Sequence, residues 1–115
     1  MTRYTSGLRG EAQAEAYLEA RGMTCLERRY RAADGELDLI MEDGETVVFV
    51  EVKYRPQSRA GEGLRAVTPN KRQRMIHAAL AYLTEKQTLD RPARFDAVEI
   101  TRDGVLHIPN AFMIE

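Results

Sequence analysis

GELDLIMEDGETVVFVEVKYR, residues 35–55, is the stretch that decides the fold. Two runs within it, Glu36–Met41 and Thr46–Tyr54, have the length and apolar content of β-strands, and Gly44 marks a turn between them. The second run has aliphatic residues at both odd and even positions, which is typical of a central strand buried on both faces. The stretch therefore predicts two neighbouring strands in the middle of a sheet.

The remaining sequence predicts one helix before this stretch and another after it. Gly22 is a C-terminal stop for the first helix, and Thr68 before Pro69 is a favoured start for the second. We expect helices over residues 6–21 and 69–86, and further strands over Met23–Arg31, Ala93–Thr101 and Val105–Ile108. The predicted fold class is α/β, in the order α-β-β-β-α-β with a mixed central sheet flanked by helices, plus a short terminal strand. At 115 residues, the chain has the length of a single domain, residues 1–115.

The composition is that of an ordinary globular protein, with 43% hydrophobic and 30% charged residues. No apolar run approaches the roughly 20 residues of a membrane-spanning helix, and the N-terminus lacks the apolar segment of a signal peptide. Cys25 is the single cysteine, which agrees with a reducing compartment. We therefore expect a cytoplasmic protein without a membrane partner.

Charge is distributed unevenly along the chain, although the formal net charge is only -1. Between Lys53 and Arg74, which we call the basic segment, seven Lys or Arg residues accompany one acidic residue, Glu62. Such a segment is either a solvated surface or a phosphate-binding surface beside a reactive site. The candidate nucleic-acid-binding residues are Arg55, Arg59, Arg65, Lys71, Arg72 and Arg74.

Charged side chains interrupt both predicted strands of the central stretch. Side chains alternate between the two faces of a strand, so Glu51 and Lys53 share one face of the second run. In the first run, Asp38 faces away from Leu37 and Leu39, which share the other face. If the two runs are neighbours, Asp38 can lie beside Glu51. Two carboxylates and an ammonium group then converge near the end of a largely buried sheet.

A charge in such a place is costly unless it is paired or bound to a metal. Asp38 and Glu51 supply hard oxygen ligands of the type that Mg²⁺ or Mn²⁺ prefers, and the backbone carbonyl of Val52 can supply another. Lys53 can position or deprotonate a water and offset the charge of a phosphate oxygen. These residues favour metal-assisted hydrolysis of a phosphodiester. In the alternative interpretation, Asp38 is solvated, and Glu51 and Lys53 form a structural ion pair.

Longer motifs resemble a known family of small bacterial proteins. They are GLRGEAQAEAYLEARG, ERRYRAADGELDLI, VFVEVKYR, NKRQRMIHAALAYL and RFDAVEI, and together they extend over almost the whole chain. In these motifs the chain resembles the YraN family, whose members are often likened to Holliday-junction resolvases. GELDLI followed by VVFVEVKYR also resembles the Asp…Glu-x-Lys core of the restriction-endonuclease-like nucleases, the PD-(D/E)xK group.

The resemblance implies a restriction-endonuclease-like core in which Asp38, Glu51 and Lys53 are catalytic. It also implies that Glu11 on the first helix is a candidate for a further metal ligand or a residue of the shell around the metal, and that Gln73 on the second helix is a polar residue adjacent to the site. By this analogy we expect a Mg²⁺- or Mn²⁺-dependent nuclease that acts on DNA, including branched or structured DNA, with a homodimer as a candidate assembly. The alternative is a non-catalytic nucleic-acid-binding or protein-adaptor module on the same fold.

Overall fold

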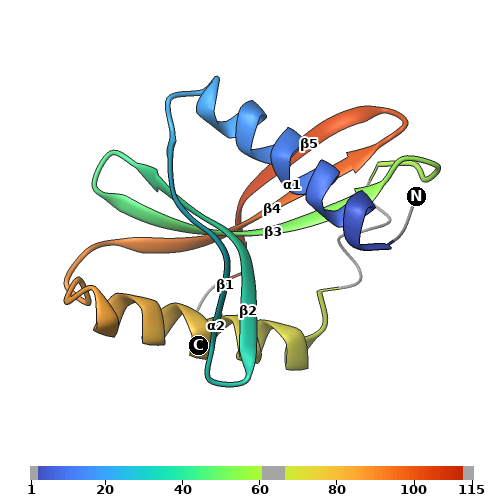
Figure 1. The fold of residues 1–115 in the computed structure, drawn as a ribbon. Helices are drawn as coiled ribbons and strands as arrows, with labels where there is room; N and C mark the ends of the chain where they lie inside the picture. The colour runs from blue at the N-terminus through green and yellow to red at the C-terminus, as the bar shows by residue number, and fades with distance from the viewer. Residues whose placement is uncertain (1–2, 61–66, 113–115) are drawn as a thin grey trace.

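The protein is represented by a computed structural model that describes residues 3–60 and 67–112, with side chains from residue 7 onward. Its elements are α1 (Arg3–Glu19), β1 (Thr24–Ala32), β2 (Gly35–Asp43), β3 (Thr46–Arg55), α2 (Pro69–Glu85), β4 (Ala93–Thr101) and β5 (Gly104–Phe112), as shown in Figure 1. The predicted order of helices and strands is confirmed. Neither of these helices is long and apolar enough to cross a membrane, within the part of the chain described.

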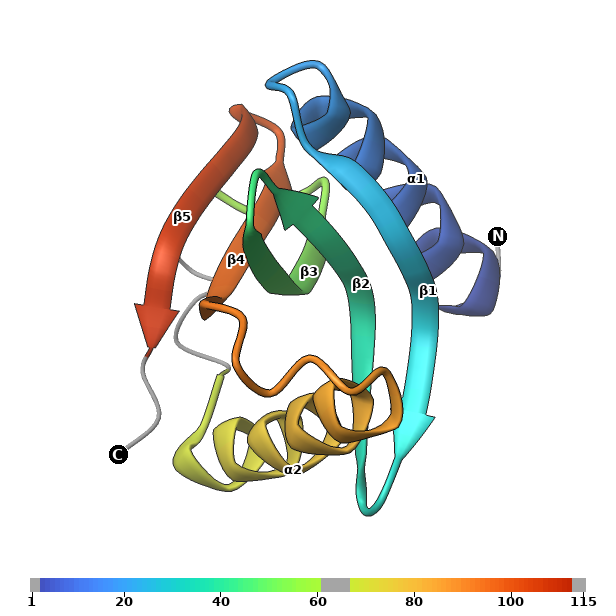
Figure 2. The same ribbon diagram turned by 90° about the vertical axis from the view of Figure 1, so that its left-hand side faces the viewer.

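The strands form one five-stranded sheet in the order β1-β2-β3-β4-β5. Neighbours are antiparallel except β3 and β4, which run parallel because α2 connects them as a crossover. Figure 2 shows β1 and β5 as the two edges of this sheet. The mixed sheet of the sequence prediction is therefore confirmed, and β3 is its central strand.

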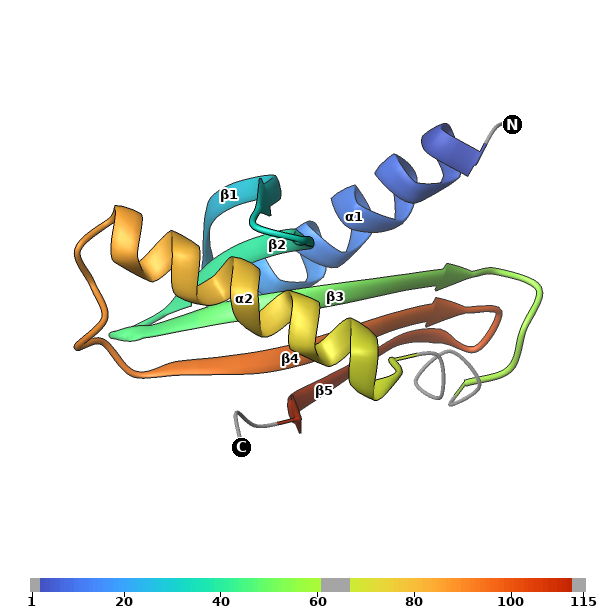
Figure 3. The same cartoon turned by 90° about the horizontal axis from the view of Figure 1, so that it is seen from below.

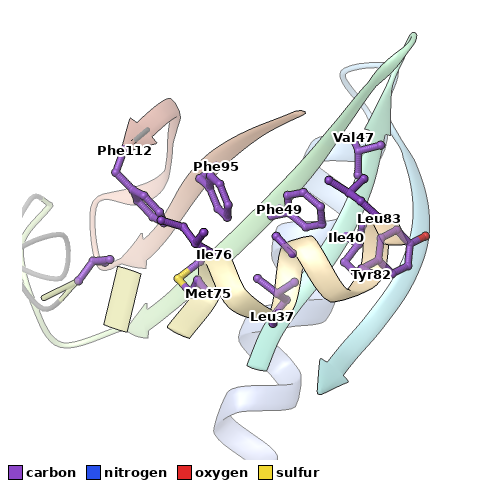
Figure 4. Packing of buried hydrophobic residues seen from close by; sticks show 13 residues of the cluster. Leu37, Ile40, Val47, Phe49, Met75, Ile76, Tyr82, Leu83, Phe95 and Phe112 are labelled. Atoms are coloured by element: carbon purple, nitrogen blue, oxygen red, sulfur yellow. The ribbon is translucent and has the colours of Figure 1, made fainter. Parts of the chain in front are cut away.

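One helix covers each face of the sheet (Figures 1 and 3). Met75, Ile76 and Leu83 of α2 pack on a cluster that includes Phe49 and Phe95, which Figure 4 shows from close by. On the opposite face, Ala14 and Leu18 of α1 are buried against Val48, Val50, Val98 and other residues of the strands. Two apolar faces of one sheet are thus each closed by a single amphipathic helix.

The last strand is longer than the sequence pattern predicts, extending from Gly104 to Phe112 instead of from Val105 to Ile108. Pro109 lowers the expectation of a strand because proline cannot donate a hydrogen bond to the ladder. At an edge strand that missing donor is tolerated. The buried carboxylate of Asp96 accepts the backbone N–H of Asn110 at 3.0 Å, which holds the end of β5 on the sheet.

The alternation of faces breaks in the middle of β2. Leu37 packs with Ile40 in the cluster beneath α2, whereas Leu39 packs in the cluster beneath α1. The predicted common face of Leu37 and Leu39 is therefore wrong. The break coincides with Asp38, whose carboxylate takes a backbone hydrogen bond that a regular ladder would have made between main chains. This irregularity separates the apolar core from the charged end of the strand pair.

Candidate active site

Asp38 and Glu51 lie side by side where the backbone ladder between β2 and β3 ends. The last paired residues in this direction are Leu39 and Val50, so the next residue on each strand brings a carboxylate to the same place. Asp38 Oδ2 accepts the backbone N–H of Val52 at 2.8 Å. The structure thus brings together the two carboxylates that the sequence pattern predicted as neighbours.

Glu51 is held between two ammonium groups. Its side chain is buried, with 4% of its surface exposed, and Lys53 Nζ lies 3.2 Å from its Oε1 atom. Lys71 Nζ donates a hydrogen bond to the same oxygen from the first turn of α2. Lys71 is one of the candidate nucleic-acid-binding residues of the basic segment, but the structure places it directly on the carboxylate pair. Proximity in the fold, which no local pattern reveals, makes Lys71 part of the site.

The carboxylates open into a pocket of about 550 Å³. Its wall comes from α1, the β1–β2 hairpin, β3 and α2, and it is lined by Glu11, Arg29, Arg31, Ala33, Asp34, Gly35, Glu36, Asp38, Glu51, Lys71, Arg74 and Met75. Lys53 is not part of this lining. Its side chain is 15% exposed, against 32% for Lys71, so of the two lysines Lys71 is the one that faces the pocket.

Burial and like charge perturb the protonation of the carboxylate pair. Burial, reinforced by the neighbouring charge of Glu51, raises the pKa of Asp38 to about 8, although the Val52 N–H opposes the shift. Burial lowers the pKa of Lys53 against the opposing charge of Glu51. Burial also acts to lower the pKa of Lys71, but the charge and hydrogen bond of Glu51 outweigh it and raise that pKa. Without a cation, the site therefore holds a proton near Asp38 at neutral pH.

Glu11 of α1 lines the pocket, and its carboxylate forms an ion pair with an arginine. Arg29 Nε donates to Glu11 Oε1 at 2.8 Å. Burial raises the pKa of Glu11, and the Arg29 guanidinium opposes that shift. In the sequence, Arg29 belongs to a short basic run with Arg28 and Arg31, which is either a phosphate contact or a solvated surface.

The structure divides the basic segment among different surroundings. Arg55 and Arg59 are exposed, and Arg65 lies outside the described residues. Arg74 lines the pocket, whereas Arg72 Nε donates to the carbonyl oxygen of Val67 at 3.1 Å. Among the described candidate residues of the basic segment, Lys71 and Arg74 line the pocket, and Arg55, Arg59 and Arg72 do not.

Gln73 lies on the outer side of α2 and does not line the pocket. Its side-chain nitrogen is 3.4 Å from the ring of His77, whose Nδ1 is in turn 2.9 Å from Asp34 Oδ1. These contacts link α2 to the turn between β1 and β2. The resemblance implies that Gln73 is adjacent to the site. Gln73 lies near the pocket wall, but its side chain is directed to His77 on the same helix.

The donor set suits a small divalent cation. Within residues 7–60 and 67–112, no three His, Cys, Asp or Glu side chains gather closely enough to form a metal cage. Mg²⁺ does not require one, since it keeps several waters and takes one or two carboxylates from the protein. Val52 directs its N–H toward Asp38, and in an extended strand the carbonyl of a residue points to the same side as its N–H. Asp38, Glu51 and the Val52 carbonyl therefore form an all-oxygen set that fits Mg²⁺ or Mn²⁺.

Comparison with known proteins finds one family over most of the chain. Residues 10–100 match the model of the uncharacterised protein family UPF0102. A UPF0102 protein of Geobacter metallireducens is 44% identical over 110 residues, covering 92% of this chain and 90% of the relative. A UPF0102 protein of Nitrosococcus oceani is 40% identical over 119 residues, covering 99% of this chain and 96% of the relative.

Proposed function

This chain belongs to the UPF0102 family, the YraN family of the sequence resemblance, and we propose that it is a divalent-metal-dependent nuclease that hydrolyses phosphodiester bonds of DNA. One observation carries the proposal. Two carboxylates on adjacent strands, the half-buried Asp38 and the buried Glu51, converge at a pocket that an ammonium group and several guanidinium groups also line. Branched or otherwise structured DNA is the proposed substrate class, and a homodimer stays a prediction.

The charge of the pocket supports a requirement for metal. Five acidic and four basic side chains line it, and with Asp38 holding a proton their charges balance before any cation binds. In that state the pocket attracts a phosphate group only weakly, through its ammonium and guanidinium groups. One divalent cation held by Asp38 and Glu51 would make the pocket positive and favour an anionic substrate.

Each polar group of the site has a separate task in the proposed reaction. Asp38, Glu51 and the Val52 carbonyl hold Mg²⁺ or Mn²⁺, which when bound supplies Lewis-acid activation of a phosphoryl oxygen and of water. Lys71 faces the pocket and binds a phosphate oxygen. Lys53 lies behind Glu51, orients its carboxylate and, with a pKa lowered by burial, can exchange a proton at Nζ.

A non-catalytic module remains the second candidate function, and one contact favours it. Two ammonium groups already neutralise Glu51, so the carboxylate is stable in the fold without a metal. In this case the pocket would bind nucleic acid or a protein partner and cut nothing.

A cleavage screen tests the nuclease proposal. Single-stranded, duplex, flap and four-way-junction DNA, with matching RNA, are incubated with Mg²⁺, with Mn²⁺ or with a chelator. We expect metal-dependent cleavage of at least one DNA substrate by the parent, reduced by about two orders of magnitude in Asp38→Asn. Asp90→Asn is the matched control, because Asp90 is exposed in the loop before β4 and lies outside the site pocket. Binding without cleavage of any substrate would favour the non-catalytic module.

A further inference from the structure

Arg29 adopts an unusual backbone conformation within a strand. Its φ angle is 49°, in the left-handed region, although Arg28 before it and Tyr30 after it pair regularly with Leu39 and Leu37 of β2. This register sets Arg29 opposite Asp38. A non-glycine residue in this region is strained and persists only where its surroundings fix it, most often at functional sites.

The other non-glycine residues with positive φ in the described chain have ordinary local explanations. Ala33 is in the turn between β1 and β2, and Gln87 follows the end of α2. Asn110 is of a residue type that tolerates the left-handed region. Arg29 is the exception, because it lies inside β1 and its side chain lines the pocket.

Helix α1 holds the guanidinium of Arg29 in the pocket. Glu11 Oε1 accepts the Arg29 Nε–H at 2.8 Å, and a Cβ atom placed on Gly7 would lie 3.1 Å from Nη2. Gly7 and Glu11 are one helical turn apart, so one face of α1 provides both the space and the hydrogen-bond acceptor. The helix itself is fixed at Gly10, where an added Cβ would lie 2.6 Å from Tyr54 Cβ on β3.

This arrangement suits recognition of a phosphate. A guanidinium presents its N–H groups in a planar fork that matches two phosphate oxygens, and a carboxylate on one nitrogen fixes the plane of the fork. Arg29 is partly exposed, at 30% of its side chain, and shares the pocket with Asp38, Glu51 and Lys71. A nucleic-acid strand entering the pocket would meet both the Arg29 guanidinium and the Lys71 ammonium.

We infer that Arg29 binds a phosphate group of the nucleic-acid strand in the pocket and that Glu11 is its positioning residue. The inference rests on the proposed function, since it names the part of the substrate that this wall of the pocket recognises. It gives Glu11 a role different from the metal ligand implied by the family resemblance. Glu11 acts through Arg29, while Asp38 and Glu51 remain the carboxylates for the cation.

Phosphate binding tests the inference without requiring cleavage. Inorganic phosphate is titrated into ¹⁵N-labelled protein with chelator present, and the Arg29 Nε–H resonance is followed by NMR. We expect saturable shifts of this resonance in the parent and about tenfold weaker phosphate affinity in Arg29→Lys, which keeps the charge and loses the fork. Arg28→Ala is the matched control, because Arg28 is the preceding strand residue, pairs with Glu15 and lies outside the pocket lining.

Glu11→Gln separates the positioning role from metal ligation. We expect weaker phosphate affinity and a displaced Arg29 Nε–H resonance, with Mn²⁺ affinity equal to that of the parent. An Arg29 resonance unmoved by phosphate in the parent, or parental phosphate affinity in Arg29→Lys, would overturn the inference. Loss of Mn²⁺ binding in Glu11→Gln with an unchanged Arg29 resonance would also overturn it. Phosphate binding through Arg29 in a protein that cuts no substrate would instead contradict the nuclease proposal alone.

Discussion

Asp38 and Glu51 are adjacent carboxylates with opposite environments, and their removal should therefore affect stability in opposite directions. Asp38 accepts one backbone N–H, which an asparagine oxygen can also accept, and it is destabilised by burial and by the charge of Glu51. Glu51 separates and neutralises two ammonium groups. We expect a higher melting temperature for Asp38→Asn in chelator, and a loss of about 1–3 kcal/mol of unfolding free energy for Glu51→Gln.

The melting measurement includes a control variant, and one outcome would contradict the prediction. Asp90→Asn removes one exposed carboxylate outside the site pocket and should leave the melting temperature unchanged. A loss of stability in Asp38→Asn equal to that in Glu51→Gln would mean that Asp38 is a structural ion-pair partner. The interpretation of the pair as a cation site would then lose its electrostatic support.

The stability of the parent should depend on pH through Asp38. The folded-state pKa is raised to about 8, whereas an aspartate in the unfolded chain titrates near 3.9. Between these values the folded state binds more protons, so stability falls as pH rises through this window and levels off above about 8. Unfolding of the parent and Asp38→Asn in chelator across the pH range should show a difference that is absent near pH 4 and grows with pH. A constant difference at all pH values would contradict the shift.

Gly10 of α1 and Gly35 of β2 let the two helices approach the strands closely, because a side chain at either position would clash with the facing element. A Cβ atom on Gly35 would lie 2.0 Å from the backbone oxygen of Arg74, so the β1–β2 hairpin touches the backbone of α2 directly. We expect Gly35→Ala to lower the unfolding free energy by about 1–3 kcal/mol, because neither backbone can yield easily. Denaturant unfolding measures this, with Ala12→Gly on the exposed side of α1 as a control for the propensity cost of about 1 kcal/mol. Gly35→Ala with parental stability would show that the hairpin is not pressed on α2.

Two arginines of the basic segment that lie on helix α2 have different surroundings. Arg74 lines the pocket, whereas Arg72 donates to Val67 and lies 5.7 Å from the centroid of the Phe112 ring. We expect Arg74→Ala to weaken duplex DNA binding and to reduce the magnitude of the salt slope by about 0.9, as one phosphate contact is lost. Arg72→Ala is the matched control from the same helix and should leave the slope close to that of the parent. Equal effects of the two substitutions would indicate a diffuse basic surface.

The elements near the site also show which features the sequence could predict. Apolar alternation with Gly44 at a turn predicts β2 and β3, and Thr68 before Pro69 predicts the start of α2, where the Thr68 hydroxyl accepts the Lys71 N–H at 3.2 Å. These signals are local. The alternation of β2 breaks where the Asp38 side chain, in place of a main-chain acceptor, takes the N–H of Val52 on the neighbouring strand. Neither this break nor the left-handed backbone of Arg29 follows from a local sequence pattern. Lys71 could not be assigned to the site because its distance from Glu51 depends on the packing of α2.

At the scale of the whole molecule, the fold concentrates opposite charges at one pocket while the net charge stays near neutral. The pocket joins α1, the β1–β2 hairpin, β3 and α2, so it forms only when both faces of the sheet are covered. Its lining carries five acidic and four basic groups, and two of the carboxylates, those of Asp38 and Glu51, lie where the ladder ends. A cation at this position would make the pocket attractive to a polyanion.

Metal binding by this carboxylate pair therefore tests the nuclease proposal most directly. The measurement is calorimetric titration of Mn²⁺ into the chelator-free parent and into Asp38→Asn at a pH near 8. We predict saturable binding to the parent and its loss in Asp38→Asn, with Asp90→Asn binding as the parent does. An absence of Mn²⁺ binding by the parent, or equal binding by Asp38→Asn, would contradict a metal-dependent site at Asp38 and Glu51.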